Sequence, residues 1–381
     1  MTNILRDQDV ILSLNDLELL HQFRKFPVFM GTVDHDASQD LFSDMNWFIS
    51  KNSGAIQLNP LLPLDVLYQE AHGSGCIGGL WMRHHKCFAD FIRQYNPSSV
   101  LEIGGAHGIL SKYYHEHVPD TRWTIIEPNP TPGLDIKARF IKGFFDDNFK
   151  LDEPVDAVIH SHVFEHVYDP KLFTEHISGF LPDGRLLIFS LPNMAEMLKR
   201  RYTNCINFEH TVLLTEPYIE FLLSQYGFRI LEQKYFLEDH SIFYACIRDK
   251  TVTPSQLPDG LYELNKATYL NYVSYHDELI KQINSKIHNI GADQKLYLFG
   301  AHVFAQYLIA FGLDVNRIEC ILDNDPNKQG KRLYGTSLYV APPKVIQHDV
   351  NPVVILKAGV YNQEIQNQII SEVNPNTIFL E

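Results

Sequence analysis

The chain has 381 residues, of which 45% are hydrophobic, so two or three domains with substantial cores are expected. Its 46 acidic residues outnumber 32 basic ones and give a net charge of −14. Arg200–Arg201 is too short for the basic patch that a nucleic acid would need, so no such partner is expected. Five cysteines without C-x-x-C spacing, no secretory leader and no membrane-long apolar run predict a cytoplasmic protein with reduced thiols and no membrane partner.

The first 75 residues predict an irregular N-terminal module. Ser13 and Asp16 have the spacing of a helix cap, and apolar residues recur at helical intervals nearby, at Leu14, Leu17, Leu20 and Phe23. We therefore expect a short helix in this region. Residues 76–95 are expected to form a longer helix that leads into the next domain.

A strand, a glycine-rich turn and a helix-like segment follow at residues 100–117. The strand contains Glu102, and the turn begins at Gly104 and ends at Gly108. Glycines let a backbone approach a ligand closely and expose N–H groups at the start of a helix. An ordinary strand-to-helix turn would show the same spacing, and the G-x-G-x-x-G pattern of nicotinamide-binding proteins is absent.

The next predicted strand, residues 123–127, resolves part of this ambiguity. It ends in Glu127, which lies 25 residues after Glu102. A carboxylate at that position is placed to accept hydrogen bonds from ribose hydroxyls. The two acidic residues and the glycine turn together predict a cofactor that contains a nucleoside.

Two later segments add further strands to the strand–turn–helix pattern described above. Residues 155–159 form an apolar strand that opens into a polar loop, and residues 180–189 form a turn and another strand. The four motifs resemble those of class I S-adenosylmethionine-dependent methyltransferases over roughly residues 80–250. The resemblance implies an α/β, Rossmann-like domain at 76–250 with S-adenosylmethionine as cofactor. The residues assigned to that cofactor are Glu102, Gly104, Gly105, Gly108, Glu127, Pro128, His160 and Ser161.

The rest of the chain predicts a linker with a long helix at 251–290 and a smaller α/β domain at 291–381. The smaller domain contains Phe299-Gly-Ala301, Asp323-Asn-Asp325 and Pro342–Pro343. These motifs resemble the C-terminal domain of sugar C-methyltransferases, which act on nucleotide-linked keto-deoxysugars. The resemblance implies a Rossmann-like domain that closes over a sugar nucleotide. An inert scaffold that only packs or dimerises is the alternative.

One departure from that family concerns metal. Sugar C-methyltransferases begin with a cysteine-rich zinc module, whereas the matching positions here are Phe26, Phe29, Lys51 and Ser53–Gly54. A structural zinc needs four Cys or His ligands at short spacing. We therefore predict a zinc-free module packed by aromatic residues, and no metal elsewhere, since the 18 histidines lack tight ligand spacing. The expected aromatic residues are Phe26, Phe29, Trp47 and Phe48.

Methyl transfer needs a positioned acceptor and, for a hydroxyl or a carbon beside a ketone, a base. The sugar C-methyltransferase pattern has a Glu-His pair that acts as base and partner, and it maps onto Glu209 and His210. The family's tyrosine two residues before the glutamate is replaced by Asn207, which we assign to substrate binding. A salt-bridged surface pair is the alternative for Glu209 and His210.

Two other polar groups complete the predicted site. The loop after the fourth strand carries His162, assigned to substrate binding, and His166, a second candidate base. Glu165-His166 could instead only shape that loop. Tyr68 and His72, in a glycine-flanked segment before the helix, are assigned to catalysis and to substrate binding, with a plain lid as the alternative.

The leading hypothesis is a methyltransferase that acts on a small activated sugar, through C-methylation of a nucleotide-linked keto-sugar. O-methylation of a sugar or natural-product hydroxyl is the alternative, because the same base could act on an alcohol. A non-catalytic binding scaffold is a third reading. The sequence does not define the acceptor or the oligomeric state.

Overall fold

The computed structural model describes residues 3–68, 78–291 and 293–381. Its largest sheet has seven strands in the order β10-β11-β9-β8-β5-β6-β7. β11 is antiparallel to its neighbours, and the other strands run in one direction. The strands are β5 (Ser99–Ile103), β6 (Arg122–Glu127), β7 (Arg139–Lys142), β8 (Ala157–Ser161), β9 (Leu186–Pro192), β10 (Phe228–Phe236) and β11 (Ser241–Arg248).

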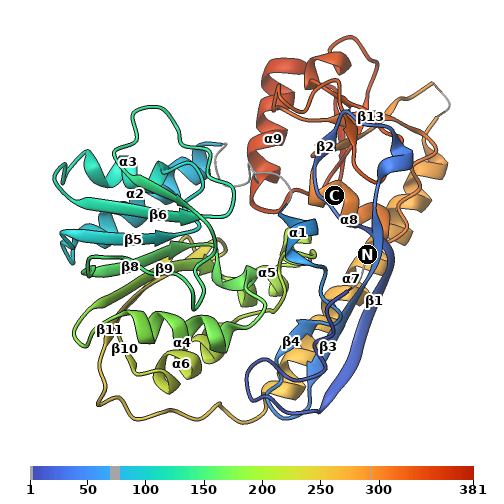
Figure 1. Cartoon of the computed structure of the whole chain (residues 1–381). Helices are drawn as coiled ribbons and strands as arrows, with labels where there is room; N and C mark the ends of the chain where they lie inside the picture. The colour runs from blue at the N-terminus through green and yellow to red at the C-terminus, as the bar shows by residue number, and fades with distance from the viewer. Residues whose placement is uncertain (1–2, 69–77, 292) are drawn as a thin grey trace.

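Helices cover both faces of this sheet (Figure 1). α2 (Gly79–Arg93) and α3 (Ile109–His115) pack on one face in a cluster that includes Phe88 and Tyr114. α4 (Pro170–Phe180) and α6 (Glu216–Gln225) pack on the other, with Phe173 and Leu222. The buried strands read as continuous apolar runs because both faces are covered. The expected α/β, Rossmann-like domain is therefore confirmed.

The strand order defines where a ligand can bind. From β5 the chain moves outward to β6 and β7, and it then returns to β8 on the other side of β5. A crevice opens at the carboxyl ends of the strands where the direction of winding changes. Gly104, Glu127 and Ser161 lie at or just beyond the ends of β5, β6 and β8.

The N-terminal part contains strands, and the short helix expected near residue 17 is wrong. β1 (Leu17–Pro27), β3 (Phe42–Ser50) and β4 (Ile56–Leu58) form an antiparallel sheet in the order β1-β3-β4. The pairing of β1 with β3 shifts register between Phe23 and Phe26. This irregularity lets Phe23 and Phe26, three residues apart, both be buried in a strand. Of the residues that suggested a helix, Leu17, Leu20 and Phe23 lie in this strand and Phe23 alone is buried, whereas Leu14 is exposed and precedes the strand.

The N-terminal part is also joined to the C-terminal domain. β2 (Thr32–Val33) pairs with β14 (Arg332–Leu333), and Arg332 forms a buried ion pair with Asp40. α7 (Leu261–Asn289) runs beside the N-terminal sheet and contributes Tyr269 and Tyr272 to the same core (Figure 1). The short helices α1 (Leu64–Leu67) and α5 (Met194–Lys199) lie between these parts and the large sheet.

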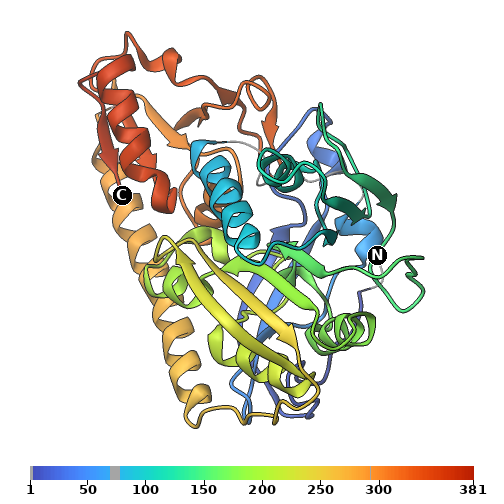
Figure 2. The ribbon, with the colours of Figure 1, turned by 90° about the vertical axis from the view of Figure 1, so that its left-hand side faces the viewer.

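The C-terminal domain is a second, smaller parallel sheet. Its five strands have the order β15-β13-β12-β16-β17. They are β12 (Leu296–Phe299), β13 (Ile318–Leu322), β15 (Val340–Ala341), β16 (Val353–Leu356) and β17 (Ile378–Leu380), with helices α8 (Val303–Ala310) and α9 (Asn362–Gln368). Figure 2 shows this domain at one end of α7. The expected second α/β domain is present.

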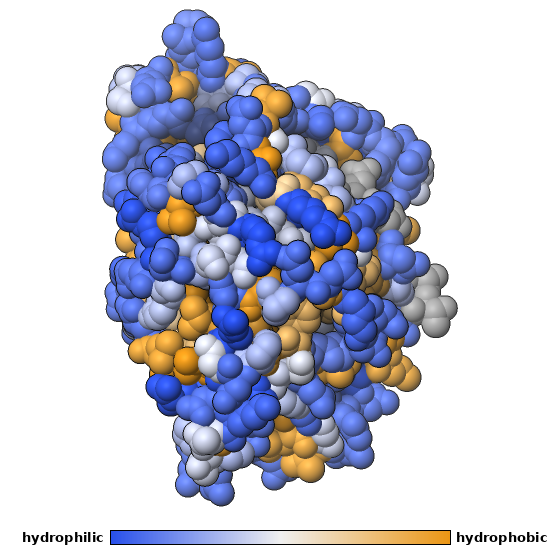
Figure 3. Space-filling view, turned by 60° about the vertical axis from the view of Figure 1, so that its left-hand side comes forward, coloured by the Kyte–Doolittle hydropathy of each residue, from blue (hydrophilic) through white to orange (hydrophobic). Residues whose placement is uncertain are grey.

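No helix among the described residues is long and apolar enough to cross a membrane. On the face shown in Figure 3, apolar residues are scattered among hydrophilic ones.

Candidate active site

A cavity of about 820 Å³ lies at the carboxyl ends of the large sheet and extends to the C-terminal domain. The sheet and its loops supply most of the lining. The C-terminal domain supplies His302, Val303, Phe304, Ala358 and Tyr361. This volume is within the usual range for small-molecule sites. The predicted site residues that line it are Tyr68, Glu102, Gly104, Gly105, Glu127, Pro128, Ser161, His162, His166, Asn207, Glu209 and His210.

The glycine turn after β5 forms one wall. Gly104 has a φ of +74°, a conformation that side chains rarely adopt. A Cβ on Gly105 would lie 2.7 Å from the carboxyl carbon of Glu102, so only glycine fits there. Gly108 does not line the cavity, but it begins α3 in the left-handed conformation. The turn therefore leaves backbone open to the cavity, as a cofactor in close contact requires.

Glu102 is buried beneath this turn. Nε1 of Trp123 donates a hydrogen bond to its Oε2 at 2.7 Å. Burial raises the pKa of Glu102 from 4.5 to about 7, although the Trp123 hydrogen bond opposes that change. The carboxyl group is held rigidly at the end of β5, where it faces the same cavity as Glu127.

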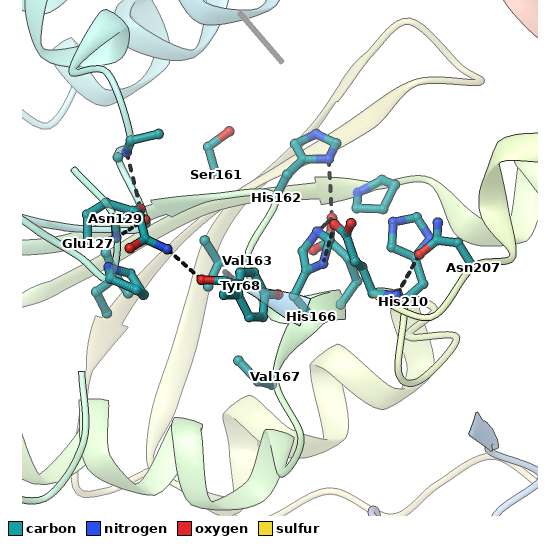
Figure 4. Close-up of a pocket in the computed structure, with 18 of the residues that line it drawn as sticks. Tyr68, Glu127, Asn129, Ser161, His162, Val163, His166, Val167, Asn207 and His210 are labelled. Atoms are coloured by element: carbon teal, nitrogen blue, oxygen red, sulfur yellow. Dashed lines mark hydrogen bonds and ion pairs between the residues drawn. The ribbon is translucent and has the colours of Figure 1, made fainter. Parts of the chain in front are cut away.

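Glu127 lies at the end of β6. Its Oε1 accepts a hydrogen bond from the N–H of Asn129 at 3.1 Å, and its Oε2 lies 3.4 Å from the N–H of Ala106. Nδ2 of Asn129 donates to the carbonyl oxygen of Tyr68 at 2.7 Å, which ties α1 to the same wall (Figure 4). A carboxylate at the end of the second strand, beside an open glycine turn, fits a ribose-containing cofactor.

The two polar residues at the end of β8 lie in different environments. Ser161 lines the cavity. His160 is fully buried, stacks on Phe189 at 4.9 Å, and has no hydrogen-bond partner for either ring nitrogen among the described residues. Burial lowers its pKa to about 3. The structure thus places His160 in the core of the sheet, because alternate strand residues face opposite sides, and not in the cavity lining.

A carboxylate that sequence reasoning treated only as part of a loop lies at the centre of the site. Oε1 of Glu165 is 3.3 Å from Nδ1 of His162 and 3.8 Å from Nε2 of His166. Burial favours its neutral form, but the hydrogen bond from His162 and the charges of His166 and His162 lower its pKa to about 2. The group is therefore an ionised carboxylate between two histidines.

His210 lies next to this cluster (Figure 4). Its ring centroid is 5.2 Å from that of His166, whose Nδ1 is 3.9 Å from Oε2 of Glu209. Oδ1 of Asn207 accepts hydrogen bonds from the N–H groups of Glu209 and His210, at 2.8 and 2.9 Å. Burial, then the nearby His166, lowers the pKa of His210. The ring is therefore neutral near pH 7.

Tyr68 caps α1 and faces the same space (Figure 4). Burial, with the charge of Glu209, raises the pKa of its phenol well above the usual value. The side chain is thus a hydroxyl group at working pH. His72, the other predicted residue in this segment, lies outside the described residues.

Several lining residues were not anticipated as site residues. Trp81 on α2 and His240, just before β11, line the cavity together with Tyr361 from the C-terminal domain. His240 lies just before β11, which runs antiparallel to the other strands, so it lies beside their carboxyl ends. This position could have identified His240 as a candidate site residue from the sequence. Nothing in the local sequence marks Tyr361.

Two family models match the chain. Residues 82–233 match a model described as a methyltransferase domain, and residues 260–379 match one described as a C-methyltransferase C-terminal domain. No curated protein matches the chain.

Solved structures resemble part of the chain. The plantazolicin methyltransferase BpumL in complex with SAH is 14% identical over 45% of this chain and 84% of its own, with a TM-score of 0.35. The N-methyltransferase NodS from Bradyrhizobium japonicum WM9 is 16% identical over 45% and 97%, with a TM-score of 0.35. An S-adenosylmethionine-dependent methyltransferase from Mesorhizobium loti is 13% identical over 42% and 96%, with a TM-score of 0.35. Because these superpositions are partial, the functional inference rests on the two family matches and on the site.

Proposed function

Since the chain carries a methyltransferase domain and a C-methyltransferase C-terminal domain, it is an S-adenosylmethionine-dependent methyltransferase, and we propose that it methylates a carbon atom beside a ketone of a sugar. The proposed acceptor is a nucleotide-linked keto-sugar, and the proposed base is His210. The observation that carries the proposal is the fixed tautomer of His210. Its Nδ1 lies 2.8 Å from the carbonyl oxygen of Cys205, which can only accept, so Nδ1 carries the proton and Nε2 is free to take one.

Each polar group then has a chemical task. When bound, S-adenosylmethionine would supply an electrophilic methyl group, and the demethylated cofactor would be a neutral thioether. The glycine turn would let the cofactor lie close to the protein backbone, and Glu127 would hold its ribose. Nε2 of His210 removes the proton beside the ketone, and the electron pair of that C–H bond passes into an enolate whose carbon forms the new bond. The negative charges of Glu165 and Glu209 favour the imidazolium form of His210 that results.

The phenol of Tyr68 can donate a hydrogen bond to the enolate oxygen. It is protonated at working pH and lines the cavity with His210. Hydrogen bonds to a developing oxyanion lower the barrier most when the donor is already in place. The C-terminal domain, which contributes Tyr361 and Phe304, would contact the rest of the acceptor.

O-methylation is the second candidate function, and one observation favours it. Asn207 stands where sugar C-methyltransferases have a tyrosine, and its Oδ1 is used to hold the backbone of Glu209 and His210. This position therefore offers no phenol to a ketone. With a hydroxyl acceptor, the same Nε2 of His210 would remove the alcohol proton.

Hydrogen exchange distinguishes the two routes. The protein would be incubated in heavy water with nucleotide-linked 4-keto-6-deoxysugars, and deuterium beside the ketone would be followed by NMR. The keto route predicts exchange above the buffer rate with wild type and near the buffer rate with His210→Ala. His117→Ala, which changes an exposed histidine, serves as the matched control. If a sugar is methylated on oxygen and its α-protons do not exchange faster than in buffer, the carbon route is wrong.

A further inference from the structure

A row of close polar contacts links Glu165 to His240. Nδ1 of His162 lies 3.3 Å from Oε1 of Glu165, and its Nε2 lies 2.9 Å from Oγ of Ser241. The same Oγ lies 2.6 Å from Nδ1 of His240. The four residues come from the loop after β8 and from the start of β11. Glu165, Ser241 and His240 are buried, and Glu165, His162 and His240 line the cavity.

The chemistry of the groups fixes the direction of these bonds. Glu165 is ionised, so it only accepts, and Nδ1 of His162 must donate to it. With the Nδ1–H of His162 directed at that carboxylate, its Nε2 accepts the hydroxyl proton of Ser241. The oxygen of Ser241 in turn accepts from Nδ1–H of His240. Burial lowers the pKa of His240 to about 3, so its ring stays neutral and Nε2 carries a lone pair.

The place of His240 in the sheet identifies which part of the cavity its side chain lines. β11 lies beyond β8 and β9 from β5, whereas Glu127 ends β6 on the other side of β5. His240 therefore lies on the half of the cavity away from the ribose-binding wall. Its ring is 5.0 Å from that of Trp81, which also lines the cavity. An aromatic ring beside a fixed hydrogen-bond acceptor suits a hydroxyl-bearing ring better than a charged group.

The same histidines also have the proximity of a metal site, since ligand atoms of His84, His162 and His240 lie within 4.8 Å of one another. Each of the three histidine rings already forms a hydrogen bond with a serine hydroxyl. Nε2 of His84 lies 3.0 Å from Oγ of Ser190, and Ser241 lies between the other two. The hydrogen bonds to the two serines, together with the contact between His162 and Glu165, favour the relay over an ion.

We propose that Glu165, His162 and Ser241 fix the tautomer of His240 so that its Nε2 accepts a hydrogen bond from a hydroxyl group of the methyl acceptor. This inference rests on the proposed function in taking the acceptor to be a hydroxylated ring. His240 touches the substrate, and Glu165, His162 and Ser241 are positioning residues.

The tautomers can be measured without any acceptor. Full-length protein labelled with ¹⁵N-histidine and saturated with S-adenosylmethionine would be studied by long-range ¹H–¹⁵N NMR near pH 7, with His240→Gln used to assign the signal. The relay predicts a neutral His240 protonated at Nδ1. A His240 protonated at Nε2, or at both nitrogens, would overturn the proposal. So would stoichiometric zinc, nickel or cobalt that is lost in His84→Asn, because the rings would then be ligands.

A serine pair gives a matched kinetic test. Ser241→Ala breaks the relay, whereas Ser190→Ala removes an equally buried hydroxyl that forms a hydrogen bond with His84, a residue outside the relay. With any sugar that wild type methylates, Ser241→Ala should raise KM about 5- to 10-fold, the effect of one lost hydrogen bond, with kcat and cofactor Kd nearly unchanged. Ser190→Ala should keep KM near wild type. Equal KM changes in both variants, or a change in cofactor Kd alone, would contradict the proposal.

The two proposals fail separately. If keto-sugars show no α-proton exchange but His240 is protonated at Nδ1, the carbon route is wrong and the relay stands. If exchange occurs and His240 has the other tautomer, the relay is wrong and the function stands.

Discussion

The carbonyl oxygen of Cys205 lies 2.8 Å from Nδ1 of His210, and it determines which nitrogen of that histidine can act as a base. A carbonyl cannot donate, so the proton is held at Nδ1 and the lone pair is held at Nε2. Cys205 is itself fully buried in the core that α5 and α7 share with the N-terminal sheet. The orientation of the proposed base is therefore set by a backbone atom in a well-packed segment.

His210→Ala should lower turnover about 10²- to 10⁴-fold, the usual contribution of a positioned base. Cofactor affinity should change little, because the ribose-binding wall is formed by other strands. Single-turnover rates and calorimetry with S-adenosylmethionine would measure the two effects. Glu209→Gln combined with His210→Ala should cost little more than His210→Ala alone, since groups that act as a unit are non-additive. If His210→Ala keeps wild-type turnover, His210 is not the base, and His166 becomes the next candidate.

The cofactor half of the site was predictable because its signals are local. Glu102, the glycine turn and Glu127 each lie at the end of a short apolar strand, and parallel strands bring such ends to one edge of the sheet. Residue type and spacing were sufficient there. His160 shows the limit, since strand alternation decides which of two adjacent polar residues faces the cavity.

The acceptor half was less predictable because distant segments meet there. His240, Trp81 and Tyr361 come from three separate parts of the chain, and no local pattern relates them. Histidine spacing in the sequence likewise gave no sign of the cluster at His162 and His240. β1 was misread for another reason: Leu17, Leu20 and Phe23 recur at helical intervals although they lie in an irregular strand.

Glu127→Ala should weaken S-adenosylmethionine binding by about 1.5–3 kcal/mol, or roughly 10- to 150-fold in Kd, because charge-assisted hydrogen bonds to the ribose are lost. Calorimetry would measure the change. Glu116→Ala, which alters an exposed residue at the end of α3, should leave Kd unchanged. A wild-type Kd in Glu127→Ala would show that the ribose lies elsewhere.

The N-terminal module should owe its stability to packing and not to zinc. Phe26 and Trp47 are fully buried, Phe29 packs against the same core, and Phe26 contacts Phe208 with ring centroids 5.9 Å apart. Phe26→Ala should cost about 3–5 kcal/mol in the free energy of unfolding, measured by urea denaturation. Phe42→Ala, at an exposed position of β3, should cost far less.

A chelator should leave the melting temperature of the wild-type protein unchanged. Mass spectrometry of the purified protein should find well under one zinc ion per chain. Zinc that survives dialysis at one per chain, with a melting temperature that falls in EDTA, would show that the module is held by metal.

Glu102 should make the stability of the cofactor-free protein depend on pH. Burial raises its pKa from 4.5 to about 7 in the folded state, so the folded protein binds the proton more tightly than the unfolded chain does. Its contribution to stability is fully present below pH 4.5 and is lost as the pH rises through 7. A change of this size corresponds to roughly 3 kcal/mol.

Glu102→Gln keeps a group that can accept the hydrogen bond from Nε1 of Trp123, but it cannot ionise. The free energy of unfolding of this variant, relative to wild type, should therefore rise steadily between pH 5 and 8. Urea denaturation at several pH values would measure the difference. Glu116→Gln, at an exposed position, should give a difference that does not vary with pH. If Glu102→Gln also gives a constant difference, Glu102 is already ionised in the folded protein near pH 5, and the carboxylate then faces the cavity with its charge.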